Sequence, residues 1–412
     1  MYKKNRDINC FALIAEFPPA YGFWGGTPNL IKTFFSSPSH PFCAIVVTDH
    51  VCPNPVPGPW DSIPTLSLFR PRSLFTHLKF GLGLLDNFAF GLQTQRVVSF
   101  LKNTGVKRQF VIIANNARLA IFAANLHLPI PRDIYIVDDF VADSAIYRVN
   151  QKAAKHALDR LVMESERVYT ISPVYASDLE QQYGRSCEFL PIPIADSLLK
   201  TIESEPLRRK ESRNALTLNR VITLHHSGQI HHLYADALVN LITLLKKIAN
   251  TNKMEIHLEL WGNNTTRNVE KALGINLREE NRKNNFKIRI CGEVSSPIEL
   301  VLEQKRSDFL LLVNSFLPEL EKQVRCSLSS KICEYLVSGI PILVYAPPYS
   351  GTVWHLAKHR AAHIISTRDT KEALLELEEI LVPPHKNRTV EAAKALAQNL
   401  HTSKAFNERI VF

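Results

Sequence analysis

Short runs of branched and aromatic residues recur along this chain, and longer stretches with helix-like spacing of apolar positions lie between them. Near-continuous apolar strands that alternate with helices are typical of a parallel sheet covered on both faces. The polar segment Ala195 to Asn219 separates two such series. The expected strands are Cys10–Ala15, Phe42–Val47, Thr65–Phe69, Phe110–Ala114, Ile134–Val137, Val168–Ile171, Glu188–Ile192, Val221–His225, Ile256–Trp261, Lys287–Cys291, Phe309–Val313, Pro341–Tyr345 and Ala362–Ile365. The expected helices are Thr27–Phe35, Leu74–Leu101, Ala117–Leu126, Asn150–Glu166, Val174–Tyr183, Leu233–Ala249, Pro297–Gln304, Lys331–Val337, Val353–Lys358 and Thr370–Leu381.

This pattern predicts two tandem, doubly wound α/β domains of the Rossmann-like type, facing each other across a cleft. Residues 1–196 form the expected N-terminal domain, 197–219 the linker and 220–394 the C-terminal domain. A terminal helix, 395–412, could pack back on the first domain. Ligands of open parallel sheets bind at the carboxyl ends of the strands, so the cleft between the domains is the expected binding site.

The composition narrows the class of protein. Of the 412 residues, 45% are hydrophobic and 21% are charged, which excludes disordered and fibrous chains. No run reaches the ~18 apolar residues that span a bilayer. The apolar segment Ile8–Ala15 is expected to be a buried strand and not a signal peptide, because Glu16 and two prolines follow it. The seven cysteines form no CxxC pair and are expected to be reduced thiols in a cytoplasmic protein.

Charge and apolar stretches give two weaker signals about partners. The net charge of +10 is spread over both halves, which argues against a nucleic-acid partner. The dense basic run Arg208–Lys210, with Arg213 and Arg220, is expected to be a solvated linker, and contact with a membrane surface or polyanion is the alternative. The stretch Leu74–Leu92 is expected to be a buried crossover helix, with an interfacial or lipid-acceptor surface as the alternative.

The most informative segment is Ser327–Tyr345. Ser329 or Ser330 is the expected N-cap of a helix, with Glu334 near the end of its first turn. The backbone amides at the start of this helix, together with Lys331, predict an anion site. Glu334 could accept hydrogen bonds from two neighbouring hydroxyls, as on a ribose. The alternative is a capping box, in which Glu334 satisfies only backbone donors.

This segment resembles the donor-binding signature of GT-B glycosyltransferases, most closely glycosyltransferase family 4 and its relatives. The likeness extends over most of the chain, because further motifs occur in the order in which the family has them. These motifs are the glycine-rich loop Phe17–Thr27, then Tyr169–Tyr175 with Tyr183-Gly184 and Leu190–Pro193, His225–Ile230, Leu260–Asn263, Ile290–Val294 and Ser307–Leu311.

The resemblance implies the GT-B fold and a Leloir-type glycosyltransferase, which moves a sugar from a nucleotide-diphosphate sugar to a hydroxyl. Relatives retain the anomeric configuration and use neither a metal nor another cofactor, and a UDP-sugar is favoured over a GDP-sugar. The expected acceptor is a glycan, a lipid-linked molecule or a small molecule. Polysaccharide biosynthesis in the cytoplasm, with peripheral contact to the membrane as an option, is the expected setting.

Residue by residue, the resemblance implies a donor site. Glu334 would bind the ribose, the amides of Ser329 and Ser330 would bind the diphosphate, and Lys331 would stabilise the charge that grows on it in the transition state. Gly228, in the first loop of the donor domain, would let the backbone approach the diphosphate closely. The other implied donor-binding residues are Ser227, Gly228 and Gly262, then Gly292, Glu293 and Val294 around the base, and Gly25 and Gly26, which would close from the first domain.

Two departures from the family's pattern bear on activity. Cys326 stands where the family carries a second glutamate, which ordinarily touches the transferred sugar. The usual Arg and Lys after the donor-loop glycine are absent, and Gln229 and the pair His231-His232 stand nearby. The candidates to replace the missing Arg and Lys are these histidines, or Lys331 and Arg325. An active enzyme is the favoured interpretation; a weakened, glycosyltransferase-like partner subunit and a nucleotide-sugar epimerase are the alternatives.

Two further clusters carry candidate chemistry. The pairs His225-His226 and His231-His232 could hold zinc, but no cysteine or carboxylate arrives nearby at ligand spacing, so no metal site is expected. Asp138-Asp139 follow the strand Ile134–Val137 and would face the cleft. One of them is expected to orient or deprotonate the acceptor hydroxyl, and capping of a helix toward Ser144 is the alternative.

Overall fold

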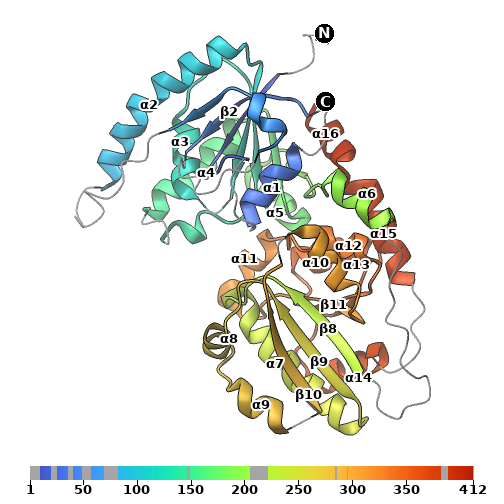
Figure 1. Cartoon of the computed structure of the whole chain (residues 1–412). Helices are drawn as coiled ribbons and strands as arrows, with labels where there is room; N and C mark the ends of the chain where they lie inside the picture. The colour runs from blue at the N-terminus through green and yellow to red at the C-terminus, as the bar shows by residue number, and fades with distance from the viewer. Residues whose placement is uncertain are drawn as a thin grey trace. The chain divides into compact units, whose positions relative to one another are not determined.

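The structure is a computed structural model of the 412-residue chain. It describes residues 10–19, 26–35, 40–48, 57–68, 82–114, 116–145, 149–204, 221–283, 285–294, 296–381 and 388–411. The chain forms two compact units, Met1–Ala195 with Ser403–Phe412, and Asp196–Thr402. Each unit contains one parallel sheet with helices on both faces, so the predicted doubly wound architecture is confirmed (Figure 1).

The first unit holds a seven-stranded parallel sheet in the order β3-β2-β1-β4-β5-β6-β7, and every strand overlaps a predicted apolar run. Its strands are β1 (Phe11–Ala15), β2 (Phe42–Val47), β3 (Thr65–Ser67), β4 (Arg108–Ile113), β5 (Arg132–Ile136), β6 (Arg167–Thr170) and β7 (Glu188–Phe189). Its helices are α1 (Gly26–Phe34), α2 (Leu82–Thr104), α3 (Ala117–Asn125), α4 (Gln151–Glu164), α5 (Pro173–Tyr183) and α16 (Ser403–Val411), with the 3-10 helices η1 (Pro59–Ser62) and η2 (Ala142–Ala145).

The second unit holds a six-stranded parallel sheet in the order β10-β9-β8-β11-β12-β13. Its strands are β8 (Val221–Ser227), β9 (Glu255–Trp261), β10 (Phe286–Gly292), β11 (Phe309–Val313), β12 (Ile342–Tyr345) and β13 (His363–Ile365). Its helices are α6 (Asp196–Ser204), α7 (His232–Thr251), α8 (Thr266–Leu273), α9 (Leu277–Lys283), α10 (Pro297–Gln304), α11 (Glu321–Cys326), α12 (Ile332–Ser338), α13 (Gly351–Lys358), α14 (Thr370–Leu381) and α15 (Arg388–Leu400), with the 3-10 helix η3 (Pro318–Leu320).

The C-terminal helix α16 returns to the first unit. Its Phe406 stacks on Phe34 of α1, with ring centroids 4.5 Å apart. The hydroxyl of Tyr169 in β6 donates to the Arg409 carbonyl at 3.0 Å. The C-terminal stretch Thr389–Phe412, expected to form one or two helices, contains α15 and α16, and the boundary between the two units falls between Thr402 and Ser403.

The segment predicted as a linker, 197–219, begins with a helix. α6 belongs to the second unit, where its Leu198 is buried. The mostly polar composition of the segment did not indicate this helix. A helix needs only a single apolar stripe to pack one of its faces. The basic run Arg208–Lys210, with Arg213 and Arg220, lies outside the described residues.

The apolar stretch Leu74–Leu92 is described from Leu82, where the long helix α2 begins. α2 connects β3 to β4, as expected of a crossover helix. None of the described helices is long and apolar enough to cross a membrane.

The prediction that the cysteines are all reduced is wrong. Cys10 and Cys43 form a disulfide, with Cα atoms 5.6 Å apart. β1 and β2 run parallel and side by side, so two residues 33 positions apart in sequence meet near the start of both strands. Spacing along the chain does not reveal this proximity. The other cysteines in the described part of the chain form no disulfide: Cys187, Cys291, Cys326 and Cys333.

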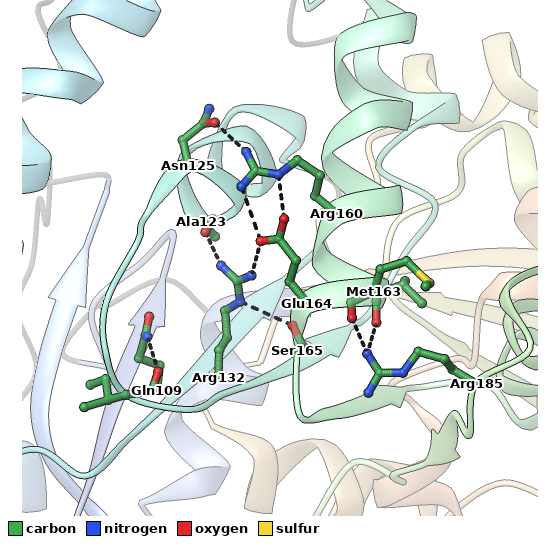
Figure 2. A network of polar contacts seen from close by, with 11 residues as sticks. Gln109, Ala123, Asn125, Arg132, Arg160, Met163, Glu164, Ser165 and Arg185 are labelled. Atoms are coloured by element: carbon green, nitrogen blue, oxygen red, sulfur yellow. Dashed lines mark hydrogen bonds and ion pairs between the residues drawn. The ribbon is translucent and has the colours of Figure 1, made fainter.

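A network of arginines ties helices to the amino ends of the first sheet (Figure 2). Arg132, at the start of β5, is buried and donates to the Ala123 carbonyl of α3 and, at 3.3 Å, to the Ser165 hydroxyl. Its guanidinium also lies 3.4 Å from Glu164 of α4, which pairs with Arg160 at 2.9 Å. Because ligands of such sheets bind at the carboxyl ends of the strands, this network serves the fold.

Candidate functional site

The strand order of the second sheet reverses between β8 and β11. Ligands of open α/β sheets bind outside the carboxyl ends of the strands at such a switch point. The strand order and the resemblance to GT-B glycosyltransferases therefore indicate the same edge of this sheet as the ligand-binding edge. The predicted donor-binding residues of the second unit lie at or just after its strand ends, or in and just before the first turn of α12: Ser227, Gly228, Gly262, Gly292, Glu293, Val294, Ser329, Ser330, Lys331 and Glu334.

Backbone hydrogen bonds join the ends of three neighbouring strands. The Gly228 amide donates to the Trp261 carbonyl at 2.8 Å, and the Gly262 amide donates to the Gly292 carbonyl at 2.7 Å. Gly262 has φ +114°, and a Cβ there would come 3.1 Å from the Gly228 Cα, so only glycine fits. The ends of β8, β9 and β10 therefore form one close-packed glycine edge.

Asn264 fixes the loop after β8, and the sequence did not predict it. Its side-chain amide donates to the Gly228 carbonyl at 3.0 Å, and its side-chain oxygen accepts from the Ile230 amide at 3.0 Å. These partners lie 36 and 34 residues away in the sequence, so no local pattern could have indicated the contact.

Lys331 precedes α12, and its side chain crosses Gly228. Its ammonium lies 4.3 Å from the ring centroid of Tyr234, on the first turn of α7. A Cβ on Gly228 would come 2.8 Å from the Lys331 Cε, so the glycine makes room for the lysine side chain. Lys331 is half-buried and forms no ion pair with any residue that the structure describes. Its positive charge is therefore available to a ligand.

Glu334 is the third residue of α12 and is half-buried. Burial raises the pKa of its carboxyl to about 7, while the positive charge of Lys331 opposes part of this shift. The carboxylate is thus held at a place that disfavours its charged form. A perturbed acid beside an unpaired cation, at the ligand edge of a sheet, is typical of a functional site.

The predicted cap of α12 is wrong. The N-cap residue is Lys331, which makes no side-chain cap, so neither a serine N-cap nor a capping box with Glu334 exists. The carbonyls of Ser329 and Ser330 accept bonds from the Ile332 and Cys333 amides at 3.1 and 3.3 Å. Both serines therefore lie in a turn that leads into α12, before its N-cap residue.

Burial keeps three histidines at this edge neutral. His225 stacks on Trp261 with ring centroids 5.5 Å apart, and burial lowers its pKa to about 3. His226 donates from Nδ1 to the Leu311 carbonyl at 3.2 Å, and burial lowers its pKa well below the usual value. Burial and the charge of Lys331 lower the pKa of His231 to about 4. None of the three supplies the positive charge that the loop lacks.

Among the residues that the structure describes, no group of three or more His, Cys, Asp or Glu side chains could hold a metal ion. The polar groups of Ser227 are also engaged within the protein. Its amide donates to the Tyr335 hydroxyl at 2.9 Å, and its hydroxyl contacts His225 Nε2 at 2.9 Å and Gln304 Nε2 at 3.3 Å. Ser227 therefore supports the loop, and Tyr335 ties α12 to the end of β8.

The remaining predicted residues lie as follows. After Gly292, which ends β10, Glu293 is exposed and Val294 is half-buried. Gly26 begins α1, and Gly25 lies outside the described residues.

Cys326, at the position of the family's second glutamate, ends α11 and is 1% exposed. Arg325 beside it is half-buried. The position therefore carries a buried thiol where the family has a charged oxygen acceptor.

The two aspartates after β5 differ in their surroundings. Asp139 is buried, and its Oδ1 accepts from the amides of Val141 and Ala142, both at 3.1 Å, so it caps η2. Asp138 is half-buried, and burial, with the nearby charges of Asp143 and Asp139, raises its pKa to about 6. A carboxyl group with this pKa exchanges its proton near neutral pH, so Asp138 is the better candidate for proton transfer.

Neither a protein-family model nor a curated protein matches this sequence. Several solved structures do resemble the whole chain. HepE from Anabaena, in complex with UDP and glucose, has a TM-score of 0.63 at 14% identity, over 98% of both chains. Sucrose-phosphate synthase from Thermosynechococcus elongatus has a TM-score of 0.64 at 10% identity, over 98% of this chain and 97% of that one. α,α-Trehalose 6-phosphate synthase from Burkholderia multivorans has a TM-score of 0.62 at 10% identity, over 98% and 96%.

Proposed function

The chain has the GT-B fold, and we propose that it is a glycosyltransferase related to family 4, which moves a sugar from a nucleoside-diphosphate sugar to a hydroxyl. The observation that carries the proposal is the meeting of Lys331, Gly228 and Glu334 at the switch point of the second sheet. An unpaired cation beside an oxygen acceptor at this edge fits a diphosphate and a ribose. The likeness to HepE, solved with UDP and glucose, supports UDP as the carrier.

In this proposal the side chains have separate tasks. Lys331 binds the diphosphate and stabilises the charge that grows on it as it leaves. Glu334, when ionised, accepts hydrogen bonds from two ribose hydroxyls. The amides of Ser329 and Ser330 and residues Gly25, Gly26, Gly262, Gly292, Glu293 and Val294 complete the proposed donor site.

We propose retention of configuration without a metal ion, because Lys331 supplies positive charge at the diphosphate. The acceptor oxygen bonds to the anomeric carbon on the face that the diphosphate leaves. The bond from that carbon to the diphosphate breaks, and a diphosphate oxygen takes the proton of the acceptor hydroxyl. Positioning and charge stabilisation then provide the catalysis.

Asp138 is proposed to orient the acceptor hydroxyl in the first unit. Its pKa of about 6 leaves most of the group ionised at pH 7, ready to accept a hydrogen bond. The expected acceptor is a glycan or a lipid-linked sugar, within polysaccharide biosynthesis at the cytoplasmic side of a membrane. Asp138→Asn should lower the rate of transfer and leave UDP affinity intact, whereas equal rates in both proteins would remove Asp138 from the site.

A weakened, glycosyltransferase-like partner subunit is the second candidate. Two observations favour it: Cys326 is a buried thiol, and the neutral histidines add no charge to the donor loop. A nucleotide-sugar epimerase of the same fold would instead act on the donor alone.

One experiment separates these functions. UDP, GDP, ADP and uridine are titrated calorimetrically into the full-length protein, and hydrolysis of the matching sugar nucleotides is followed with and without glycan acceptors. A glycosyltransferase should bind one nucleoside diphosphate and release it faster when an acceptor is present. Binding of none of them would favour the partner subunit, and isomerisation of the donor sugar without acceptor would favour the epimerase.

A further inference from the structure

The ammonium of Lys331 is placed by an aromatic ring. The face of Tyr234 lies 4.3 Å from Nζ, and the lysine methylenes pass over Gly228. Tyr234 is itself fixed, because its amide donates to the His231 carbonyl at 2.9 Å and its ring packs against the apolar core of the second unit. The ring is thus a rigid platform beneath a flexible charged side chain.

The surroundings of the ring favour a single positive charge. The imidazole of His231 lies 4.1 Å from the Tyr234 ring, and that of His226 meets it edge-on at 5.8 Å. Both imidazoles are neutral at pH 7, because burial and the charge of Lys331 lower their pKa values. Cation–π attraction therefore acts on the ammonium without repulsion from a second cation.

We propose that Tyr234 is a positioning residue, which holds Lys331 over Gly228 so that its ammonium meets the diphosphate of the donor. The inference rests on the proposed function and deepens it, since it assigns the charge that the donor loop lacks to a lysine from a distant segment. A free lysine side chain samples many rotamers, and fixing it beforehand increases its effect on binding.

The first test removes the ring and leaves an apolar side chain in its place. Tyr234→Leu should weaken UDP binding about three- to tenfold, the range of a half-buried cation–π contact, and leave uridine binding within about twofold. Tyr234→Phe keeps the ring face, so its loss for UDP should be clearly smaller than that of Tyr234→Leu. A general structural defect would weaken the binding of UDP and uridine equally.

A matched control exists in the first unit. Lys155 Nζ lies 5.2 Å from the ring centroid of Tyr183, so Tyr183→Leu removes a cation–π contact outside the candidate site. It also removes the Tyr183 hydroxyl, which donates to Asp159 at 2.6 Å and accepts from Lys155 at 3.0 Å. This variant should bind UDP as the unaltered protein does. Comparison of its melting temperature with that of Tyr234→Leu shows how much of any loss comes from stability.

The second test moves the charge from one helix to the other. Lys331→Ala should weaken UDP binding about ten- to hundredfold, as expected when a charge-assisted contact is lost. Adding Tyr234→Lys places an ammonium near the same spot from α7, and it should recover at least fivefold of that affinity. This recovery of UDP affinity requires a positive charge at that location. A purely structural role of Tyr234 would not produce it.

The outcomes separate the two proposals. Selective loss of UDP binding in Tyr234→Leu, with recovery in the double variant, supports the inference. If UDP binds the unaltered protein but Tyr234→Leu leaves its affinity unchanged, or weakens uridine equally, the inference is wrong and the proposed function stands. If the unaltered protein binds no nucleoside diphosphate, the proposed function falls, and the inference falls with it.

Discussion

The amino edge of the first sheet and the carboxyl edge of the second both carry half-buried or buried charged groups, but the partners of these groups differ. At the first, Arg132 donates to a carbonyl, a hydroxyl and a carboxylate (Figure 2). Arg108, on the neighbouring strand, lies 2.8 Å from the buried Asp133. At the second, Lys331 faces a ring, and Glu334 is held where its charge is disfavoured. Burial disfavours the charged forms at both edges, since it also lowers the pKa of Arg132 and raises that of Asp133. The charges at the first edge have protein partners, whereas Lys331 forms no ion pair with any described residue.

This difference separates structural from functional charge without reference to any relative. When the partners of a buried charge are protein groups, removing one partner leaves the others unsatisfied and destabilises the fold. A charge that lacks such a partner, in an environment that opposes its ionised form, reduces stability, and such groups concentrate at sites of binding and catalysis. The comparison therefore predicts opposite results for substitutions at the two edges.

The largest effect is expected at the arginine network. Arg132→Met should lower the free energy of unfolding by about 3 kcal/mol, because the Ala123 carbonyl and Ser165 hydroxyl lose a buried donor. Chemical denaturation measures this loss. Lys331→Met, the matched change at the other edge, should alter stability by less than about 1 kcal/mol, since no ion pair is lost there. Equal losses in the two variants would contradict the distinction.

The next effect concerns Glu334 and depends on pH. A folded-state pKa of about 7, above the usual value of 4.5, means that the folded protein binds this proton more tightly than the unfolded chain. Stability is therefore lost as pH rises from about 4.5 through 7. Glu334→Gln should be more stable than the unaltered protein by about 2 kcal/mol at pH 8 and should match it near pH 4. A difference in stability that does not change with pH would show that the carboxyl is not perturbed.

The affinity for uridine tests the functional role of Glu334 with the same substitution, Glu334→Gln. Uridine carries no phosphate, so its own charge does not change between pH 6 and 8. Binding to the unaltered protein should strengthen over this range, as Glu334 ionises and can accept from both ribose hydroxyls. Glu334→Gln should show a flat and weaker affinity, measured by calorimetry. A rise of equal size in both proteins would assign the titration to another group.

The smallest effect is expected at the rim of the arginine network. Arg160 pairs with Glu164 across one helical turn of α4, and the Glu164 side chain is 44% exposed. Arg160→Ala should lower stability by about 0.5 kcal/mol, and the loss should shrink at high salt because exposed pairs are screened. Thermal melting at two salt concentrations measures it. A loss of stability as large as that of Arg132→Met would mean that the contribution of each arginine does not depend on its burial.

The strands were predictable from the sequence because parallel strands buried on both faces must be apolar along their whole length. The run Phe309–Val313 coincides with β11, and Phe42–Val47 coincides with β2. Short polar helices such as α8 and α9 leave no comparable signal, and they were missed. The linker prediction overlooked α6 for the same reason.

The candidate site was predictable only in part. Lys331, Glu334 and Gly228 lie in local motifs, so the sequence identifies them. Asn264 and Tyr234 act through space, the first on a loop 34 to 36 residues away and the second on a lysine that precedes another helix. Their roles follow from how the strand ends meet, which no single segment encodes. The disulfide of Cys10 and Cys43 escaped prediction in the same way.

A crystal structure of the full-length protein soaked with UDP tests the central claim most directly. The account predicts a diphosphate oxygen within hydrogen-bond distance of Lys331 Nζ, beside the loop at Gly228. It also predicts both ribose hydroxyls within reach of the Glu334 carboxylate. UDP bound elsewhere, or its absence at millimolar concentration from a crystal in which this edge is open to solvent, would contradict the account.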